Sequence, residues 1–399
     1  KNDEFFGECV DPSNERLKYL TGFSGSAGQA LVLKKKAFLF VDGRYTLQAQ
    51  KEIKKGFKMV EIHKTKPLEI LKKNKKKLII GFDPKLYTQA ILTNLFVSKN
   101  VKLIPIKTNL IDKIWSNRPK LKFNKFFILK TRYVGQSYEH KINLICNILK
   151  RKKLKNLLIT APENVAWLLN IRGKDSSYSP IPNCNAIINY KKKVTLIVKN
   201  SKINENFKSH FGKNLKYLNP SNIIKYFNSL NSNESFLIDK ITCSLFYKEK
   251  IAKKYKYVEK IDPIFFLKSK KNNVEINNTI KSHIFDGVAL TKFICWIKNN
   301  INRFKITELS AKKKLEQFRK KNKNYISPSF DTISASGPNG AMPHYKVNNN
   351  TNRKIKINDI YLCDSGGQYH YGTTDVTRTI CFCKQSRRVK NIFTKVLKG

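Results

Sequence analysis

The chain has 399 residues, of which 41% are hydrophobic, and its 79 Lys and Arg outnumber its 28 Asp and Glu to give a formal net charge of +51. This length suits about two to three domains, and no stretch approaches the roughly 18 consecutive apolar residues of a membrane span, which argues against a membrane protein. Lysines occur in every segment, so the charge indicates a compositional bias at solvated positions rather than a specific nucleic-acid site, with only weak, salt-sensitive association with RNA.

The first part of the chain alternates strand and helix patterns, which is typical of an α/β domain. Strands are predicted at 29–33, 37–41, 78–82 (short and buried) and 126–129 (closing this region). A helical or extended stretch at 139–151 leads into a second α/β unit. Its predicted strands lie at 157–160, 186–188, 194–198 and 236–238.

A third region opens near Pro263. An amphipathic helix is predicted from apolar residues that recur with helical spacing at Ile280, Ile284, Val288, Phe293, Ile294, Ile297 and Ile301. Thr307 is the predicted N-cap of a second helix that turns Leu315 and Phe318 inward. Strand and loop follow over 326–344, and a polar linker over 348–356 leads to the next strands.

Two aspartates, Asp364 and Asp375, stand eleven residues apart in a segment that predicts a β-hairpin, because β-prone flanks enclose Gly366, Gly367 and Gly372. A symmetric register centred between Tyr369 and His370 would place the two carboxylates opposite each other, with Cβ atoms about 4.5–5.5 Å apart. Like charges at that distance repel unless a divalent cation, or a pair of them, lies between them. The spacing alone leaves an Asx-turn role open.

With these residues the chain resembles the aminopeptidase P group (Xaa-Pro aminopeptidases) of the pita-bread metallopeptidases, in the long form with two creatinase-like domains before the catalytic one. The matching segments are Leu17-Lys-Tyr-Leu-Thr-Gly-Phe-Ser-Gly-Ser-Ala-Gly28, Val41-Asp-Gly-Arg-Tyr-Thr-Leu-Gln-Ala49, Asn164-Val-Ala-Trp-Leu-Leu-Asn-Ile-Arg-Gly173, His283-Ile-Phe-Asp-Gly-Val-Ala289, Ser329-Phe-Asp-Thr-Ile-Ser-Ala335, Gly337-Pro-Asn-Gly-Ala341, His344-Tyr345 and the aspartate hairpin. Each segment is modest by itself, and their joint order is specific.

The resemblance implies an α/β plus α+β protein with two creatinase-like N-terminal domains, at 1–150 and 151–265, and a partial pita-bread catalytic domain at 266–399. It implies a metal-dependent aminopeptidase that releases the N-terminal residue from peptides with proline in second position, by attack of a metal-bridging hydroxide. A homodimer, peptide partners and no specific nucleic-acid or membrane partner are also expected. The eight cysteines are scattered without a CxxC pair, which predicts free thiols and a cytoplasmic location.

The implied metal ligands are Asp364 and Asp375, which would hold two divalent ions, Mn²⁺ with Co²⁺ or Zn²⁺ as alternatives. His344 is the implied catalytic residue, against the plainer reading of an idle, exposed loop histidine. The family site also needs one His and two Glu, which no motif of this chain supplies, so we expect a chain truncated at both ends and incomplete for catalysis. Tyr371 departs from the family, which usually carries Asp there, and this puts the turn geometry in doubt.

A non-catalytic pita-bread protein that binds peptides or nucleic acid is the alternative interpretation. The sequence beyond Gly399 would distinguish the two.

Overall fold

The computed structural model describes residues 2–73, 77–121 and 124–399. The chain forms two compact units, Lys1–Val274 and Glu275–Gly399. Lys1, at which the sequence analysis expects the chain to be truncated, lies outside the described ranges. Among the helices of these ranges, none combines the length and the apolar character needed to cross a membrane.

The first unit begins with a three-stranded sheet in the order β1-β2-β3, where β2 pairs antiparallel with β1 and parallel with β3. The strands are β1 (Gln29–Val32), β2 (Ala37–Val41) and β3 (Phe57–Glu61), and the neighbouring helices are α1 (Arg16–Thr21), α2 (Thr46–Glu52), α3 (Pro67–Lys72), α4 (Gln89–Phe96) and α5 (Leu110–Ile114). The predicted strand at 78–82 is β4 (Leu78–Phe82), but it is not buried: it pairs only with β5 (Val101–Pro105), and Ile79 is 66% exposed.

A six-stranded mixed sheet in the order β11-β10-β9-β7-β12-β13 forms the second part of this unit. Its strands are β7 (Asn156–Ile159), β9 (Asn185–Asn189), β10 (Val194–Ile197), β11 (Leu215–Leu218), β12 (Ser235–Asp239) and β13 (Lys256–Lys260). Its helices are α6 (Thr131–Val134), α7 (Tyr138–Arg151), α8 (Pro162–Leu169), α9 (Glu205–Phe211), α10 (Ile223–Ser229), α11 (Leu245–Ala252) and α12 (Pro263–Ser269). The four strands predicted here are therefore confirmed, and the stretch over 139–151, expected to be helical or extended, is the helix α7.

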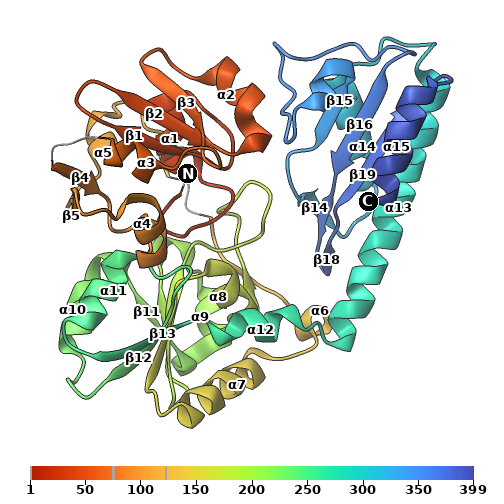
Figure 1. Cartoon of the computed structure of the whole chain (residues 1–399). Helices are drawn as coiled ribbons and strands as arrows, with labels where there is room; N and C mark the ends of the chain where they lie inside the picture. The colour runs from red at the N-terminus through yellow and green to blue at the C-terminus, as the bar shows by residue number, and fades with distance from the viewer. Residues whose placement is uncertain (1, 74–76, 122–123) are drawn as a thin grey trace. The chain divides into compact units, whose positions relative to one another are not determined.

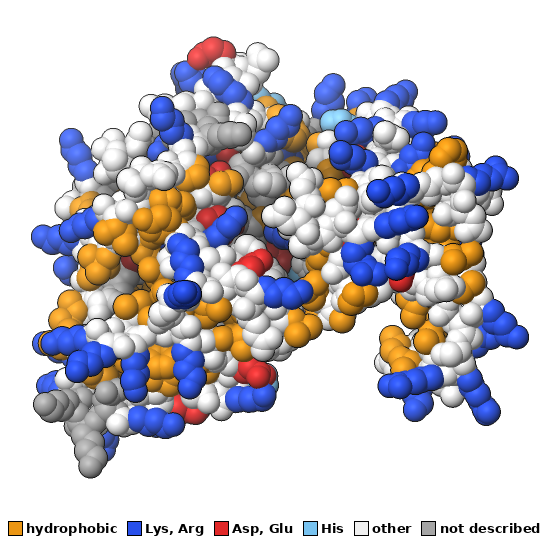
Figure 2. Space-filling model, turned by 90° about the horizontal axis from the view of Figure 1, so that it is seen from above, with side chains coloured by type: hydrophobic (Ala, Val, Ile, Leu, Met, Phe, Trp, Pro, Cys, Tyr) orange, Lys and Arg blue, Asp and Glu red, His pale blue; other side chains and the backbone are white. Residues whose placement is uncertain are grey.

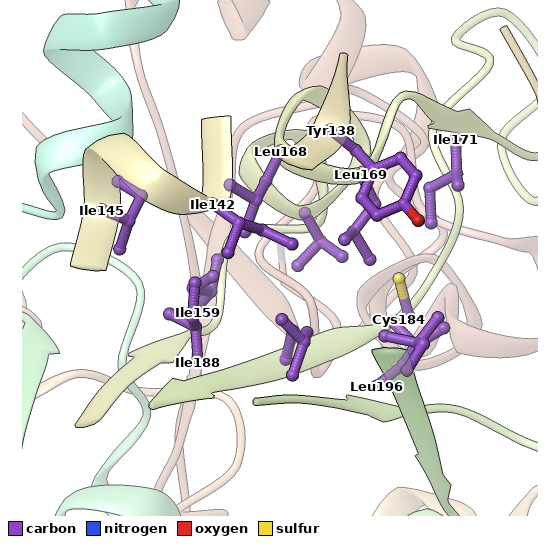
Figure 3. Close-up of a cluster of buried hydrophobic side chains, with 14 of the residues drawn as sticks. Tyr138, Ile142, Ile145, Ile159, Leu168, Leu169, Ile171, Cys184, Ile188 and Leu196 are labelled. Atoms are coloured by element: carbon purple, nitrogen blue, oxygen red, sulfur yellow. The ribbon is translucent and has the colours of Figure 1, made fainter. Parts of the chain in front are cut away.

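Every residue of the strands β7 and β10 is buried because both faces of the sheet are covered by helices. On one face Leu157, Ile159 and their neighbours pack against α7, α8 and α9, and Figure 3 shows Ile142 and Ile145 of α7 and Leu168 of α8 directed toward Ile159 and Ile188. On the other face Leu158 and its neighbours pack against α10 and α11. Alternate residues of one strand thus supply two separate cores.

The strand predicted at 126–129 is shorter and belongs elsewhere than expected. Only Phe127–Ile128 (β6) is extended, and it pairs antiparallel with β8 (Ile171–Arg172) rather than closing the first sheet. The cause is Phe126, whose buried ring packs in the core between the six-stranded sheet and α7 and so holds this segment beside that core.

The second unit, whose residues are all described, combines three helices with two small antiparallel sheets (Figure 1). The helices are α13 (Asn273–Asn300), α14 (Glu308–Lys320) and α15 (Arg387–Lys398), and the strands are β14 (Tyr325–Pro328), β15 (Ile333–Ser336), β16 (Ile360–Ser365), β17 (Gly367–Tyr369), β18 (Gly372–Thr373) and β19 (Val376–Cys381). Phe293 of α13, Leu315 of α14 and Tyr361 of β16 belong to one core, so α13 and α14 cover the β15-β16-β19 sheet. Thr307 caps α14 as predicted, within a capping box that Ser310 completes.

The predicted helix exists, but the buried face of its first half differs from the apolar pattern. Phe293 and Ile297 are buried, whereas Ile280, Ile284 and Val288 are 55%, 61% and 49% exposed. Ser282 and Asp286 take the inner face instead. The reason is local contact: Asp286 binds Arg319, and the hairpin comes so near to Ser282 that a Cβ on Gly372 would lie 2.3 Å from its hydroxyl oxygen.

The eight cysteines lie within the described ranges, where none of them forms a disulfide. Figure 2 shows Lys and Arg side chains spread across the displayed face rather than gathered in one patch.

We predict that Phe207→Ala lowers the free energy of unfolding by about 3–5 kcal/mol, because it empties a fully buried ring site in the core of the six-stranded sheet. Phe266→Ala is the matched control, since this ring is 63% exposed and its loss should change stability by less than about 0.5 kcal/mol. Urea denaturation followed by circular dichroism measures both, and equal losses would contradict the assignment of this core.

Candidate metal centre

The hairpin register differs from the predicted one. Asp364 pairs with Thr377 rather than with Asp375, and farther along Tyr369 pairs with Gly372. The hairpin therefore turns through His370 and Tyr371, one position later than the predicted centre. Two-residue turns are the tightest hairpin connection, and this turn determines the pairing of the strands behind it.

The two aspartates nevertheless remain on the same side of the hairpin. Asp375 precedes β19 and lies two residues before Thr377, the pairing partner of Asp364. Because side chains alternate with a period of two, a shift of two residues turns direct neighbours into diagonal neighbours on the same face. The predicted direct opposition is wrong, while the predicted proximity holds.

The charges that act on Asp364 include those of Asp375 and His344, so both of these residues lie near Asp364. Burial raises the pKa of the Asp364 carboxyl above its usual value, and the charge of Asp375 adds to the rise. A hydrogen bond with Thr377 and the imidazole of His344 act in the opposite direction. Asp364 is half-buried, whereas Asp375 and His344 are exposed.

The environment of Asp364 fits a bound cation. Its Oδ1 is buried and has no hydrogen-bond partner among the residues that the structure describes. A buried carboxylate oxygen without a partner is costly, and a divalent cation would satisfy it. Within residues 2–73, 77–121 and 124–399, however, no three His, Cys, Asp or Glu side chains come together as a set that could hold a metal ion. The chain thus supplies two carboxylates toward such a site.

The backbone around Gly366 and the backbone around Thr374 cross closely, and this crossing keeps Asp364 and Asp375 near each other. Ser329 donates from its hydroxyl to the carbonyl oxygen of Thr374 (2.8 Å), and the Gly367 amide donates to the Thr374 hydroxyl (2.9 Å). A Cβ on Gly366 would lie only 2.0 Å from the Thr374 carbonyl oxygen. Glycine is required at this position because the backbone next to Asp364 touches the backbone next to Asp375.

A buried ion pair between Arg319 and Asp286, which the sequence analysis missed, binds the hairpin to two helices. Arg319 of α14 donates from Nε and Nη2 to the two carboxylate oxygens of Asp286 on α13, at 2.7 and 2.9 Å. The same guanidinium donates to the Ser365 hydroxyl at 3.0 Å, and the Tyr369 hydroxyl donates to Asp286 at 2.8 Å. Residues on both sides of Gly366 are therefore tied to two helices. The one available signal was Asp286, a carboxylate that lies within the matching segment His283–Ala289 of the amphipathic helix.

His344 follows the 3-10 turn Gly337–Ala341 and has a left-handed backbone, with φ of 58°. The next residue, Tyr345, is buried and donates a hydrogen bond to Glu308. The exposed histidine is thus carried by a segment that is anchored beside it. His283 and His370 are also exposed, and neither is assigned the catalytic role expected of His344.

Three protein-family models match successive parts of the chain. Two models of the Creatinase/Prolidase N-terminal domain match residues 11–114 and 117–275, and the Metallopeptidase family M24 model matches residues 278–399.

Known proteins are similar to this chain over nearly its whole length. "Xaa-Pro aminopeptidase ApepP" of Drosophila melanogaster is 36% identical over 97% of this chain and 65% of its own length. A "Probable Xaa-Pro aminopeptidase P" of Coccidioides posadasii is 34% identical over 100% of this chain and 68% of its own length. The crystal structure of an X-prolyl aminopeptidase from Caenorhabditis elegans, described as a cytosolic enzyme with a di-nuclear active site, superposes with a TM-score of 0.91 at 28% identity, over 97% of this chain and 65% of that one. The chain spans about 65% of the length of the first of these relatives.

We predict that Arg319→Met destabilises the second unit by about 3–5 kcal/mol, because it leaves the Asp286 carboxylate buried without its cation. Lys320→Met is the matched control: the neighbouring residue makes only an exposed i,i+4 pair with Glu316, worth about 0.3–0.5 kcal/mol. Denaturant unfolding of both variants checks this, and similar stabilities would argue against the supporting role of the buried pair.

We also predict that Gly366→Ala destabilises this unit by at least about 1–3 kcal/mol, since the new methyl group would collide with the backbone of Thr374. Gly340→Ala serves as comparison, because no described heavy atom lies within 4 Å of the Cβ that it would add. Thermal unfolding of the two variants is the measurement, and a stable Gly366→Ala protein would refute the close crossing.

Proposed function

Because the chain belongs to the Xaa-Pro aminopeptidase family, with creatinase/prolidase N-terminal domains followed by an M24 metallopeptidase domain, we propose that a protein of the relatives' length that contains it is a metal-dependent aminopeptidase. Its substrates are peptides with proline in second position, from which it releases the N-terminal residue. The division into domains at 1–150, 151–265 and 266–399 is part of this proposal.

The observation that supports the proposal most is the arrangement around Asp364. A half-buried carboxylate with one unpartnered buried oxygen lies near a second carboxylate, Asp375, and near an imidazole, His344. Repulsion between the carboxylates and burial both disfavour the ionised form of Asp364 in the absence of a cation. A divalent cation would offset both effects, because its positive charge stabilises the two ionised carboxylates.

Asp364 and Asp375 are the residues of this chain that would hold two divalent cations. Oxygen ligands favour Mn²⁺, with Co²⁺ or Zn²⁺ as alternatives. Such ions, when bound, polarise a carbonyl group and lower the pKa of water, so that a nucleophile is available at neutral pH. The dinuclear site described for the Caenorhabditis elegans enzyme supports two ions rather than one.

His344 would act on the substrate itself. Its side chain is exposed on an anchored turn beside the carboxylates, so its ring nitrogens are accessible to the peptide. An imidazole there can donate a hydrogen bond to the carbonyl oxygen as negative charge develops on it, or exchange a proton with the substrate amine.

A cytoplasmic, homodimeric enzyme completes the proposal. The description of the Caenorhabditis elegans protein as a cytosolic enzyme supports the location. The alternative is a non-catalytic pita-bread protein that binds peptides or nucleic acid. It is favoured by the observation that the described residues bring only two carboxylates, and no third ligand, to the site.

We predict that the full-length protein, loaded with Mn²⁺, hydrolyses Xaa-Pro peptides, and that Asp364→Asn or Asp375→Asn lowers both metal content and kcat/KM by at least about 100-fold. Asp331→Asn is the control, because this carboxylate of the same unit pairs with Lys312 and should leave activity within about threefold. Metal content by plasma mass spectrometry and product release by chromatography are the measurements. Absence of Xaa-Pro cleavage by the metal-loaded protein would favour the binding-protein alternative.

A further inference from the structure

Glu308, the first residue of α14, is a carboxylate with no exposed surface and no cation beside it among the described residues. It is balanced by hydrogen-bond donors instead. The amide of Ser336 donates to Oε1 at 2.7 Å, and the amide of Arg353 donates to Oε2 at 3.1 Å. The side chains of Asn339 and Tyr345 complete the set, with the Asn339 amide nitrogen 3.0 Å from Oε1 and the Tyr345 hydroxyl 2.9 Å from Oε2.

These four donors are spread along one segment of the chain, residues 336–353. Ser336 ends β15, Asn339 lies in the 3-10 turn that follows, and Tyr345 comes directly after His344. Arg353 belongs to the linker that leads to β16, and Glu308 also donates its own amide to the Arg353 carbonyl oxygen at 3.0 Å. One side chain therefore fastens the whole turn that carries His344 to the start of a helix.

Only an ionised carboxylate suits this position. All four groups around it are donors, and a carboxylate accepts on both oxygens, whereas a glutamine would direct an NH₂ group at two of them. The amino end of α14 favours a negative charge. Burial raises the pKa of Tyr345 to about 12, so its hydroxyl keeps the proton that it donates to Glu308 at neutral pH.

We propose that Glu308 is a positioning residue for His344: it holds the 336–345 turn so that the exposed imidazole stays directed toward the carboxylates Asp364 and Asp375. The left-handed backbone of His344 supports this assignment, because a non-glycine residue with φ of 58° keeps that conformation only where its surroundings impose it. Buried Tyr345 on one side and the Glu308-bound turn on the other are those surroundings. The proposal rests on the peptidase function proposed above.

Glu308→Gln in the full-length, Mn²⁺-loaded protein tests the proposal, with Ser310→Ala as matched control. Ser310 completes the capping box of the same helix end through hydrogen bonds with Thr307, so its loss weakens α14 without removing a hydrogen bond between Glu308 and the turn. We expect Glu308→Gln to lower kcat by about 10- to 100-fold, because a displaced imidazole loses part of a general acid–base contribution of about 100-fold or more. KM should stay within about threefold and metal content should be unchanged.

The same substitution in a His344→Ala background distinguishes positioning from general damage. If Glu308 acts through His344, Glu308→Gln should change kcat by less than about threefold once the imidazole is gone. A full additional loss in that background, or a kcat for Glu308→Gln equal to that of Ser310→Ala, would overturn the proposal.

A structural measurement covers the case in which the wild-type protein has no peptidase activity. Hydrogen–deuterium exchange of the peptides over 337–345 should then rise in Glu308→Gln and not in Ser310→Ala. Failure of wild-type cleavage sinks the proposed function, whereas unchanged exchange over this turn sinks the positioning role of Glu308.

Discussion

The second unit depends on a buried charge pair placed where an apolar contact would ordinarily be. Arg319 and Asp286 are almost fully buried, at 1% and 2% side-chain exposure, and meet through two hydrogen bonds. A pair of this kind adds little net stability over a hydrophobic contact, but losing one partner is strongly destabilising. Its value here is geometric, because the guanidinium also binds Ser365 and the carboxylate also binds Tyr369. The hairpin is thereby attached to two helices on both sides of Gly366.

The hairpin and the histidine turn are held in the same manner by different groups. Arg319 binds Ser365 in the strand that carries Asp364. Glu308, at the other end of α14, binds the turn that carries His344. A single helix therefore presents a buried cation and a buried anion to the two segments of the candidate site. The rigid helix sets the separation of these anchors, which places the candidate ligands and the imidazole on a common scaffold.

The residues of the candidate site differ in exposure: the groups that anchor it are buried, and the groups that could act are accessible to solvent. The anchoring groups are buried, whereas Asp375 and His344 reach solvent and Asp364 is half-buried with one oxygen unpartnered. Substrate and cations would therefore meet side chains whose neighbours are fixed in advance. Preorganisation of this kind is what allows carboxylates and imidazole to act on a developing charge without first reorganising.

The sequence alone predicted most of the strands, the helices α13 and α14, the Thr307 cap and the family, and it pointed to three candidate site residues, because these follow from local patterns and the order of motifs. It could not determine the hairpin register: the one-position displacement of the turn to His370 and Tyr371 depends on how the segment contacts its neighbours. It also assigned the wrong inner face to the first half of α13, since Asp286 is buried only because Arg319, 33 residues away, reaches it. Glu308 was missed for the same reason. Partners distant in the chain decide which polar groups can be buried, and only the tertiary structure brings those partners together.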